Sequence, residues 1–384
     1  MTDDDPAEDS GSPVSPDEPL GSDAGFDGID RIEGGHRRGV SDRDDADGAP
    51  RDGTLFVLVA GWTDTARIDG ISGAGTGDAA VHTPGVDAEL LSYGDVVRGP
   101  GVPTSPTGCP SPALVTRAAR ETLGFDYVVV DGGLAKPTGA ATVSVGASPG
   151  ADVREPDPVG TAPGAFAAAR EWASRVPAER LVIGETVPGG TTTALATMRA
   201  LGEEWSVSSS LPENPLELKR EVVEEALAAS DLAPGEAAHH PELAVRFAGD
   251  PVLAVVAGLT VGATEADRDV VLGGGTQLLA AGALVRHAGV AAPLTLATTS
   301  YLADDAPDLR EAAAALDLDL RVTDPGFERA PLTRFATEAM EGAGMGGALS
   351  LADGADRIDD VRERTRTLLD DLGLGDADGR DDAP

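Results

Sequence analysis

The residues best suited to binding or transforming a ligand lie in two short segments. The first, residues 184–193, reads GETVPGGTTT, and the second, residues 341–347, reads EGAGMGG. Each sets one carboxylate beside several glycines. Glycine lets a backbone approach a ligand closely, and a carboxylate can accept a proton from it. We therefore expect both segments to border one ligand site.

The first segment has the pattern of a phosphate-binding turn. It follows the apolar run Leu181–Ile183 and leads into residues 194–198, ALATM, so the chain reads as strand, turn and helix start. Free N–H groups at a helix N-terminus and threonine hydroxyls supply donors for an anion. We predict that Gly189, Gly190, Thr191 and Thr192 contact a phosphate. The competing interpretation is an ordinary connection with threonine caps.

In the second segment, Glu341 stands beside a bend with little side-chain bulk around Gly342 and Gly344. This arrangement is typical of a place where a ligand ring lies against backbone next to a general base.

Lys219 is one of only two lysines, the other being Lys136, in a chain that otherwise uses arginine. It lies in a predicted helix after the hydroxyl-rich Ser208–Ser210. A compact ammonium suits a phosphate, so we predict that Lys219 binds one. The alternative is a solvated helix face.

Residues 273–277, GGGTQ, again join a strand to a helix, and we expect Gly273 and Gly274 to pack closely against a ligand or the sheet. Leu278 replaces the third glycine of the dinucleotide fingerprint, which argues against a nicotinamide dehydrogenase.

The sequence favours a phosphomonoester substrate without metal or cofactor. Asp131-Gly132-Gly133 is superficially similar to a pyrophosphate–ribose loop, but the second acid that Mg²⁺ would need is missing. The five histidines show no metal-ligand spacing.

The net charge of −37 argues against nucleic acid or anionic membranes as partners, since both are bound through cationic contacts. It suits a very salty cytoplasm, where screening quenches self-repulsion, so we expect folding and activity to require high salt. Cys109 is the only cysteine, and the sequence shows no signal-peptide pattern, so we expect a cytoplasmic protein.

Around these segments the sequence predicts an alternation of strands and helices. Apolar runs ending in glycine or hydroxyl-rich turns predict strands at 55–60, 127–130, 180–183, 270–272 and 293–298. Helices are predicted at 111–123, 165–175, 215–229, 251–262, 276–287, 308–315 and 357–372.

Together these elements indicate a doubly wound α/β fold with a mostly parallel sheet, flanking helices and a small helical subdomain from the chain ends. Ligands bind beyond the carboxyl ends of such strands. We assign residues 1–52 to an acidic disordered tail, 53–350 to the α/β domain, 351–374 to a C-terminal helix and 375–384 to a second acidic tail.

These motifs resemble the nicotinate-nucleotide:dimethylbenzimidazole phosphoribosyltransferase family of cobalamin nucleotide-loop assembly, most closely its archaeal branch. The resemblance covers about residues 54–350. It rests on 184–195, 208–218, Lys219, 274–277 and 341–347, and on Thr83-Pro84 with Asp87-Ala88-Glu89-Leu90.

The resemblance implies that a benzimidazole nitrogen attacks the anomeric carbon of nicotinate mononucleotide, releasing nicotinate and forming α-ribazole 5′-phosphate. It implies Glu341 as the base, Glu185 at the ribose or in proton handling, and Lys219 on the phosphate. It also implies a homodimer with the site near the interface.

The chain departs from the bacterial members at Gly190, where they usually have Asn, and we do not find their N-terminal benzimidazole-pocket segment. The acceptor therefore stays open among dimethylbenzimidazole, another benzimidazole, adenine and a phenol. Rival interpretations are a noncatalytic nucleotide-binding protein and a hydrolase or phosphorylase of the same fold. Retention of both glutamates favours the enzyme, because a carboxylate near a phosphate is otherwise unfavourable.

Overall fold

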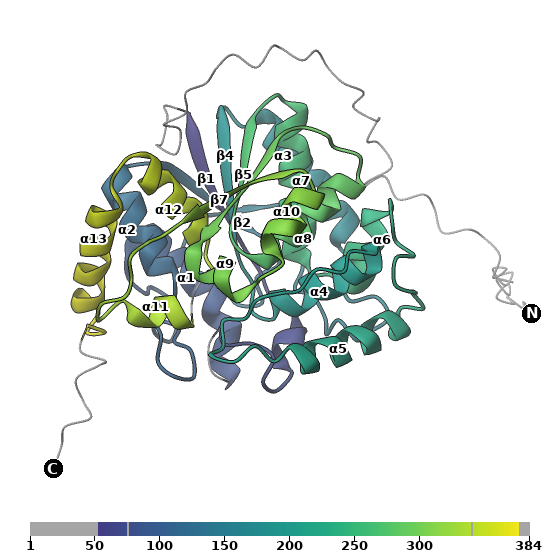
Figure 1. Ribbon diagram of the computed structural model, residues 1–384, viewed down its shortest axis with the longest axis horizontal. Helices are drawn as coiled ribbons and strands as arrows, with labels where there is room; N and C mark the ends of the chain where they lie inside the picture. Colours follow the sequence, from purple (N-terminus) through teal and green to yellow (C-terminus); the bar gives the residue numbers. More distant parts are fainter. Residues whose placement is uncertain (1–52, 75–76, 339–340, 376–384) are drawn as a thin grey trace, which may run out of the picture.

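The computed structural model describes residues 53–74, 77–338 and 341–375, and its centre is a seven-stranded parallel sheet (Figure 1). The strand order is β3-β2-β1-β4-β5-β6-β7. Their bounds are β1 Thr54–Ala60, β2 Asp126–Asp131, β3 Thr142–Ser144, β4 Arg180–Thr186, β5 Asp269–Gly273, β6 Leu294–Thr299 and β7 Leu318–Thr323. Each neighbouring pair runs parallel, which confirms the predicted doubly wound fold.

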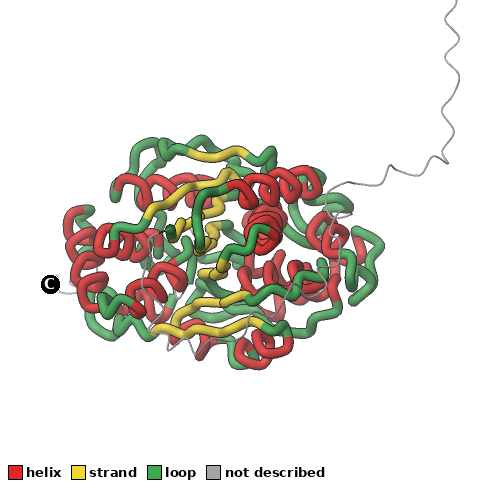
Figure 2. Tube along the Cα trace, turned by 90° about the horizontal axis from the view of Figure 1, so that it is seen from above, coloured by secondary structure: helices red, strands yellow, loops and turns green. Residues whose placement is uncertain are grey.

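Helices cover both faces of this sheet (Figure 2). One layer holds α1 Thr83–Tyr93, α2 Ala113–Leu123, α12 Met345–Gly354 and α13 Ile358–Asp371. The other holds α3 Ala162–Arg175, α4 Gly190–Leu201, α5 Leu216–Ala229, α6 Pro241–Ala248, α7 Pro251–Glu265 and α8 Thr276–His287. The shorter elements are η1 Asp64–Arg67, η2 Gly77–His82, α9 Ser300–Asp305, α10 Leu309–Ala315 and α11 Thr333–Thr337.

The two central strands are apolar because both their faces are covered. Along β1, Val57 and Val59 pack beneath the α3 and α7 layer, whereas Phe56 and Leu58 pack beneath the α2 and α12 layer. Every residue of β4 is buried. A strand covered on both faces reads as a continuous apolar run, which is why the sequence marks β1 and β4 clearly.

The sheet order reverses between β1 and β4. From β1 the chain builds outward through β2 and β3, and then crosses back to start β4 on the other side of β1. Loops leaving the carboxyl ends of these neighbours diverge and open a crevice, which is where doubly wound proteins bind ligands. Residue Glu185 lies at this end of β4.

Five of the seven strands were predicted, whereas β3 and β7 were missed. The β3 strand is short and half-exposed, and β7 lies at an edge of the sheet with several partly exposed side chains, so neither forms a long apolar run. The expected helical group at the chain ends is represented by α12 and α13. These helices pack on α2, and α12 also packs on the sheet.

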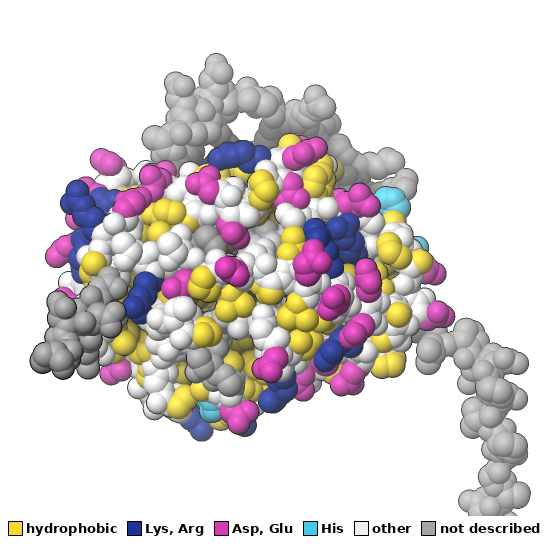
Figure 3. Space-filling view, turned by 60° about the horizontal axis from the view of Figure 1, so that its bottom comes forward, with side chains coloured by type: hydrophobic (Ala, Val, Ile, Leu, Met, Phe, Trp, Pro, Cys, Tyr) yellow, Lys and Arg dark blue, Asp and Glu magenta, His cyan; other side chains and the backbone are white. Residues whose placement is uncertain are grey.

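The domain boundaries stay a prediction. The N-terminal tail, 1–52, lies outside the described residues, and so does the C-terminal tail beyond Gly375. On the face shown in Figure 3, acidic side chains are spread over the surface with basic ones between them.

Candidate active site

A pocket opens at the carboxyl ends of β1 and β4, at the reversal of the strand order. It holds about 980 Å³ of atom-free space, part of it open to solvent. Both segments from the sequence analysis line it, contributing Glu185, Gly189, Gly190 and Thr191 from one and Glu341 and Gly342 from the other. Three carboxyl groups, those of Asp87, Glu185 and Glu341, lie among the described lining residues, which include no lysine or arginine.

The first segment forms a tight turn between β4 and α4. Gly189 has φ of 81°, a left-handed conformation that favours glycine, and a Cβ there would lie 2.9 Å from the Ala66 backbone nitrogen. The amide N–H of Gly190 donates to the Val187 carbonyl, and that of Thr192 donates to the Gly189 carbonyl. Thr191 lines the pocket at the first turn of α4, where the helix dipole favours an anion.

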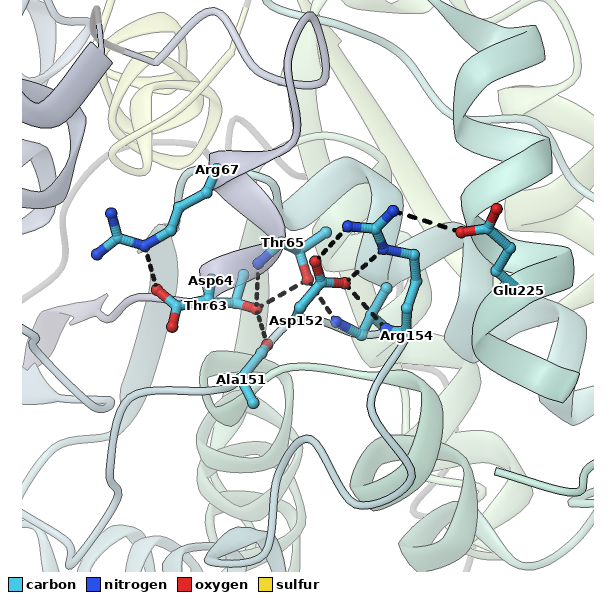
Figure 4. A network of polar contacts seen from close by, with 9 residues as sticks. Thr63, Asp64, Thr65, Arg67, Ala151, Asp152, Arg154 and Glu225 are labelled. Atoms are coloured by element: carbon cyan, nitrogen blue, oxygen red, sulfur yellow. Dashed lines mark hydrogen bonds and ion pairs between the residues drawn. The ribbon is translucent and has the colours of Figure 1, made fainter. Parts of the chain in front are cut away.

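The η1 segment that supports this turn is fixed by a polar network (Figure 4). The Thr63 hydroxyl donates a hydrogen bond of 2.8 Å to the Ala151 carbonyl and accepts one from the Thr65 amide. Asp64 accepts from Arg67 at 2.7 Å. These contacts tie the loop after β1 to the loop at residue 151, and so hold Ala66 against Gly189.

The second segment is the predicted bend followed by a helix, because residues 341–344 form a turn and α12 begins at Met345. Its glycines let α12 approach the strand ends at backbone contact distance. A Cβ on Gly184 would lie 2.4 Å from the Gly344 Cα, and one on Gly273 would lie 2.6 Å from the Gly347 Cα. Gly273 and Gly344 therefore serve helix–sheet packing and do not line the pocket. Gly274 does not line the pocket either, and a Cβ there would meet the Leu278 side chain at 2.7 Å.

This close approach brings Glu341 to the pocket. Its carboxylate accepts hydrogen bonds from the amides of Gly346 at 2.8 Å and Gly342 at 3.1 Å. Burial raises the pKa of Glu341 to about 7, although these N–H donors favour the charged form. A carboxyl with such a pKa gains and loses a proton near neutrality, as a general base requires.

Glu185 has a different environment. Burial raises its pKa to about 8, and the negative charges of Asp250, Glu341 and Asp87 act in the same direction. Its hydrogen bond from the Val187 amide opposes this rise. Because Glu185 and Glu341 share one pocket, their protonation states are coupled.

Two buried aspartates support the site. Asp250 caps α7 by accepting from the Leu253 amide, and it also accepts from the Thr193 hydroxyl at 2.5 Å and from Gln277 Nε2 at 2.8 Å. It therefore joins the starts of α4, α7 and α8. Sequence reasoning missed it, although an Asp directly before Pro251 is a helix-start signal.

Asp87 was not predicted as a site residue, although it lies in residues 87–90, one of the stretches that resemble the family. It lines the pocket from α1, and its carboxylate accepts from the hydroxyls of Ser111 and Thr186, both at 2.6 Å. Burial raises its pKa to about 6, against the effect of both hydroxyls.

The structure places Lys219 behind the pocket wall and not in it. The side chain is fully buried, and its Nζ donates to the Ser208 carbonyl at 2.7 Å and to Asn214 Oδ1 at 3.1 Å. Burial lowers the pKa of Lys219 to about 7. The ammonium thus holds Ser208–Ser210, which line the pocket. Thr192 is likewise buried and absent from the lining.

Within the described ranges, no cluster of three or more His, Cys, Asp and Glu side chains is arranged to hold a metal ion. In the same part of the chain, no helix is both long enough and apolar enough to cross a membrane.

The fold and the pocket define a doubly wound α/β protein with an acidic site at the reversal of its strand order. Two solved structures from Thermus thermophilus are similar to it. One is CobT, with a TM-score of 0.54, 21% identity and coverage of 85% of this chain and 87% of that chain. The other is called a nicotinate-nucleotide-dimethylbenzimidazole phosphoribosyltransferase, with a TM-score of 0.52, 21% identity and coverage of 84% and 85%. The predicted resemblance is thus confirmed for the fold.

The chain belongs to the UPF0284 family. It is 55% identical to a UPF0284 protein of Halobacterium salinarum over 325 residues, covering 83% of this chain and 98% of that protein. A UPF0284 protein of Methanosarcina mazei is 40% identical over 309 residues, covering 78% and 88%. These relatives are archaeal, as the resemblance implied, and their name states no activity. No protein-family model matches the chain.

Proposed function

We propose that the protein transfers the phosphoribosyl group of nicotinate mononucleotide to an azole base. The observation that carries this proposal is the pairing of two carboxyl groups, Glu185 and Glu341, in one pocket beside a glycine- and threonine-rich turn. A protein that only bound a phosphate would need neither carboxyl, because a negative charge near the anion weakens binding.

In the proposed reaction an azole nitrogen forms a bond to the anomeric carbon of the ribose. The bond from that carbon to the pyridinium nitrogen breaks, and its electron pair neutralises the pyridinium, so the leaving nicotinate needs no general acid. The azole N–H proton passes to Glu341. The products are nicotinate and α-ribazole 5′-phosphate, formed with inversion.

The site suggests a role for each group. Thr191 and the start of α4 would bind the phosphate, together with Ser209 and Ser210 from the facing loop. Glu185, with a pKa of about 8, would be neutral at pH 7 and so able to donate to a ribose oxygen. Lys219 would act through Ser208 and not by touching the phosphate. The ionised carboxyl groups of Asp87 and Glu341 would favour a cationic pyridinium.

The test is nicotinate release from nicotinate mononucleotide by the purified protein in molar KCl, with and without an azole, with the product identified by mass spectrometry. The proposal expects release that depends on the azole and a product with the mass of α-ribazole phosphate. Release without any azole would instead indicate a hydrolase. Saturable nucleotide binding without release with any base would indicate a noncatalytic nucleotide-binding protein.

A further inference from the structure

The wall of the pocket around Asp87 differs from the glycine turn in what it can offer a ligand. We call this wall the Asp87 end, and it consists of Thr83, Asp87, Ser105, Cys109, Ser111 and Thr186. It adjoins the second segment, because Pro112, next to Ser111, lies 3.0 Å from where a Cβ on Gly342 would be.

The hydroxyl protons at the Asp87 end are already used inside the protein. Ser111 and Thr186 donate to Asp87, and Ser105 donates to Glu338 at 2.6 Å. The Thr83 hydroxyl donates to the Ala74 carbonyl at 3.1 Å, and the Cys109 thiol faces the Pro110 carbonyl. A hydroxyl has one proton, so these oxygens are left only with lone pairs.

Asp87 itself has accepting capacity left over. A carboxylate offers about four lone-pair sites, and each oxygen of Asp87 accepts one bond, from Ser111 or from Thr186. A ligand with no donor would leave this desolvated carboxylate under-bonded, which is unfavourable.

On the basis of the proposed function, we propose that Asp87 selects the acceptor. The preferred acceptor is an azole base with a second hydrogen-bond donor, an amino or hydroxyl group, in addition to the azole N–H that Glu341 deprotonates. Methyl groups facing Asp87 offer no hydrogen-bond donor, and a carboxylate on the base would be repelled by the Asp87 carboxylate. Asp87 is thus a specificity-determining residue.

The experiment compares 5-hydroxybenzimidazole and 5-aminobenzimidazole with 5,6-dimethylbenzimidazole, using nicotinate release to obtain kcat/KM. The wild-type protein is expected to favour the hydroxy and amino bases by about tenfold or more, the discrimination that one under-bonded buried group produces. Asp87→Asn replaces one accepting oxygen by a donor and is expected to abolish this preference. Equal or better use of the dimethyl base by the wild-type protein would overturn the proposal.

Ser111→Ala is the matched control, because it removes one donor to the same carboxylate and keeps the carboxylate itself. It is expected to retain the preference for donor-bearing bases, and loss of the preference would contradict the role of Asp87. If no base triggers release, the proposed function fails, but calorimetric binding of the same bases still tests Asp87. Binding of the donor-bearing bases about tenfold more tightly supports the inference, and equal binding overturns it.

Discussion

The two glycine-rich segments place their glutamates in the same pocket by different means. In the first, Gly189 makes a left-handed turn against η1, and the turn itself forms the wall. In the second, glycines bring the backbone of α12 onto β4 and β5, and the wall receives Glu341 and Gly342 as a result. The negative charges of nearby carboxyl groups raise the pKa of Glu185, which accepts one backbone N–H bond, whereas Glu341 accepts two such bonds.

Similar glycine patterns thus serve ligand contact in one segment and the packing of a helix on the sheet in the other. The difference between the two segments also separates the two carboxyl groups chemically. The N–H donors hold Glu341 closer to its ionised form, so it suits a base, whereas the like charges around Glu185 favour its protonated form. Paired carboxyl groups whose environments differ in this way commonly divide acid and base roles.

A substitution of Glu341 tests this division, and we expect it to reduce activity more than any other change. Glu341→Gln cannot accept a proton, so we expect kcat to fall by about 100- to 10,000-fold, the range for loss of a general base. The dissociation constant for nicotinate mononucleotide, measured by calorimetry, should change little. The control is Glu224→Gln on the exposed face of α5. A near-normal rate in Glu341→Gln would remove Glu341 from the base role.

A second test concerns packing. In Gly344→Ala the new Cβ would meet Phe56 Cζ at 2.6 Å on a residue with φ of 73°, so we expect a loss of about 2 kcal/mol or more in the free energy of unfolding. Urea unfolding in molar salt measures it. Gly164→Ala is the control, because a Cβ there has nothing within 4 Å. Equal stability of the two variants would contradict the packing role.

The third test changes the charge near Glu185. An anionic nucleotide binds better while Glu185 is neutral, so affinity should weaken as the pH rises through about 8. Asp250→Asn removes one of the charges that raise this pKa, leaving Asp87 and Glu341, and the weakening should begin at lower pH. Asparagine can still cap α7.

Nucleotide affinity between pH 6 and 9 measures the effect of Asp250→Asn. The surface variant Asp157→Asn, which disrupts the ion pair with Arg246, should leave the profile unchanged. An unchanged pH dependence of affinity in Asp250→Asn would show that the charge of Asp250 does not raise the pKa of Glu185.

We expect the weakest effect on binding from a change at Lys219, which holds the Ser208–Ser210 wall of the pocket. Lys219→Met removes the hydrogen bonds to Ser208 and Asn214, and each such bond contributes about 0.5–1.5 kcal/mol. We expect a severalfold weaker nucleotide affinity with kcat nearly unchanged, because Lys219 touches neither glutamate. Lys136→Met, at the exposed second lysine, is the control. A large loss of kcat would place Lys219 in the chemistry.

The sequence predicts the parts of this molecule that depend on local pattern. The buried strands β1 and β4 form uninterrupted apolar runs, and the turn at Gly189 has the composition of a turn. The placement of Lys219 could not be predicted. The sequence shows only that lysine is rare in this chain, whereas the contact between Lys219 and Ser208 depends on tertiary packing. The role of Gly344 depends on Gly184, which is 160 positions away.

The reliance of the pocket on α12 has a consequence for the order in which the chain is made. Residues 54–60 and 180–186 are synthesised long before Glu341, yet the pocket lacks its proposed base until residues 341–347 settle onto Gly184 and Gly273. Contacts between such distant segments form slowly. During synthesis the N-terminal part of a chain emerges and folds first. A nascent chain that ends before residue 341 would therefore already contain β1 and β4 but would lack the proposed base.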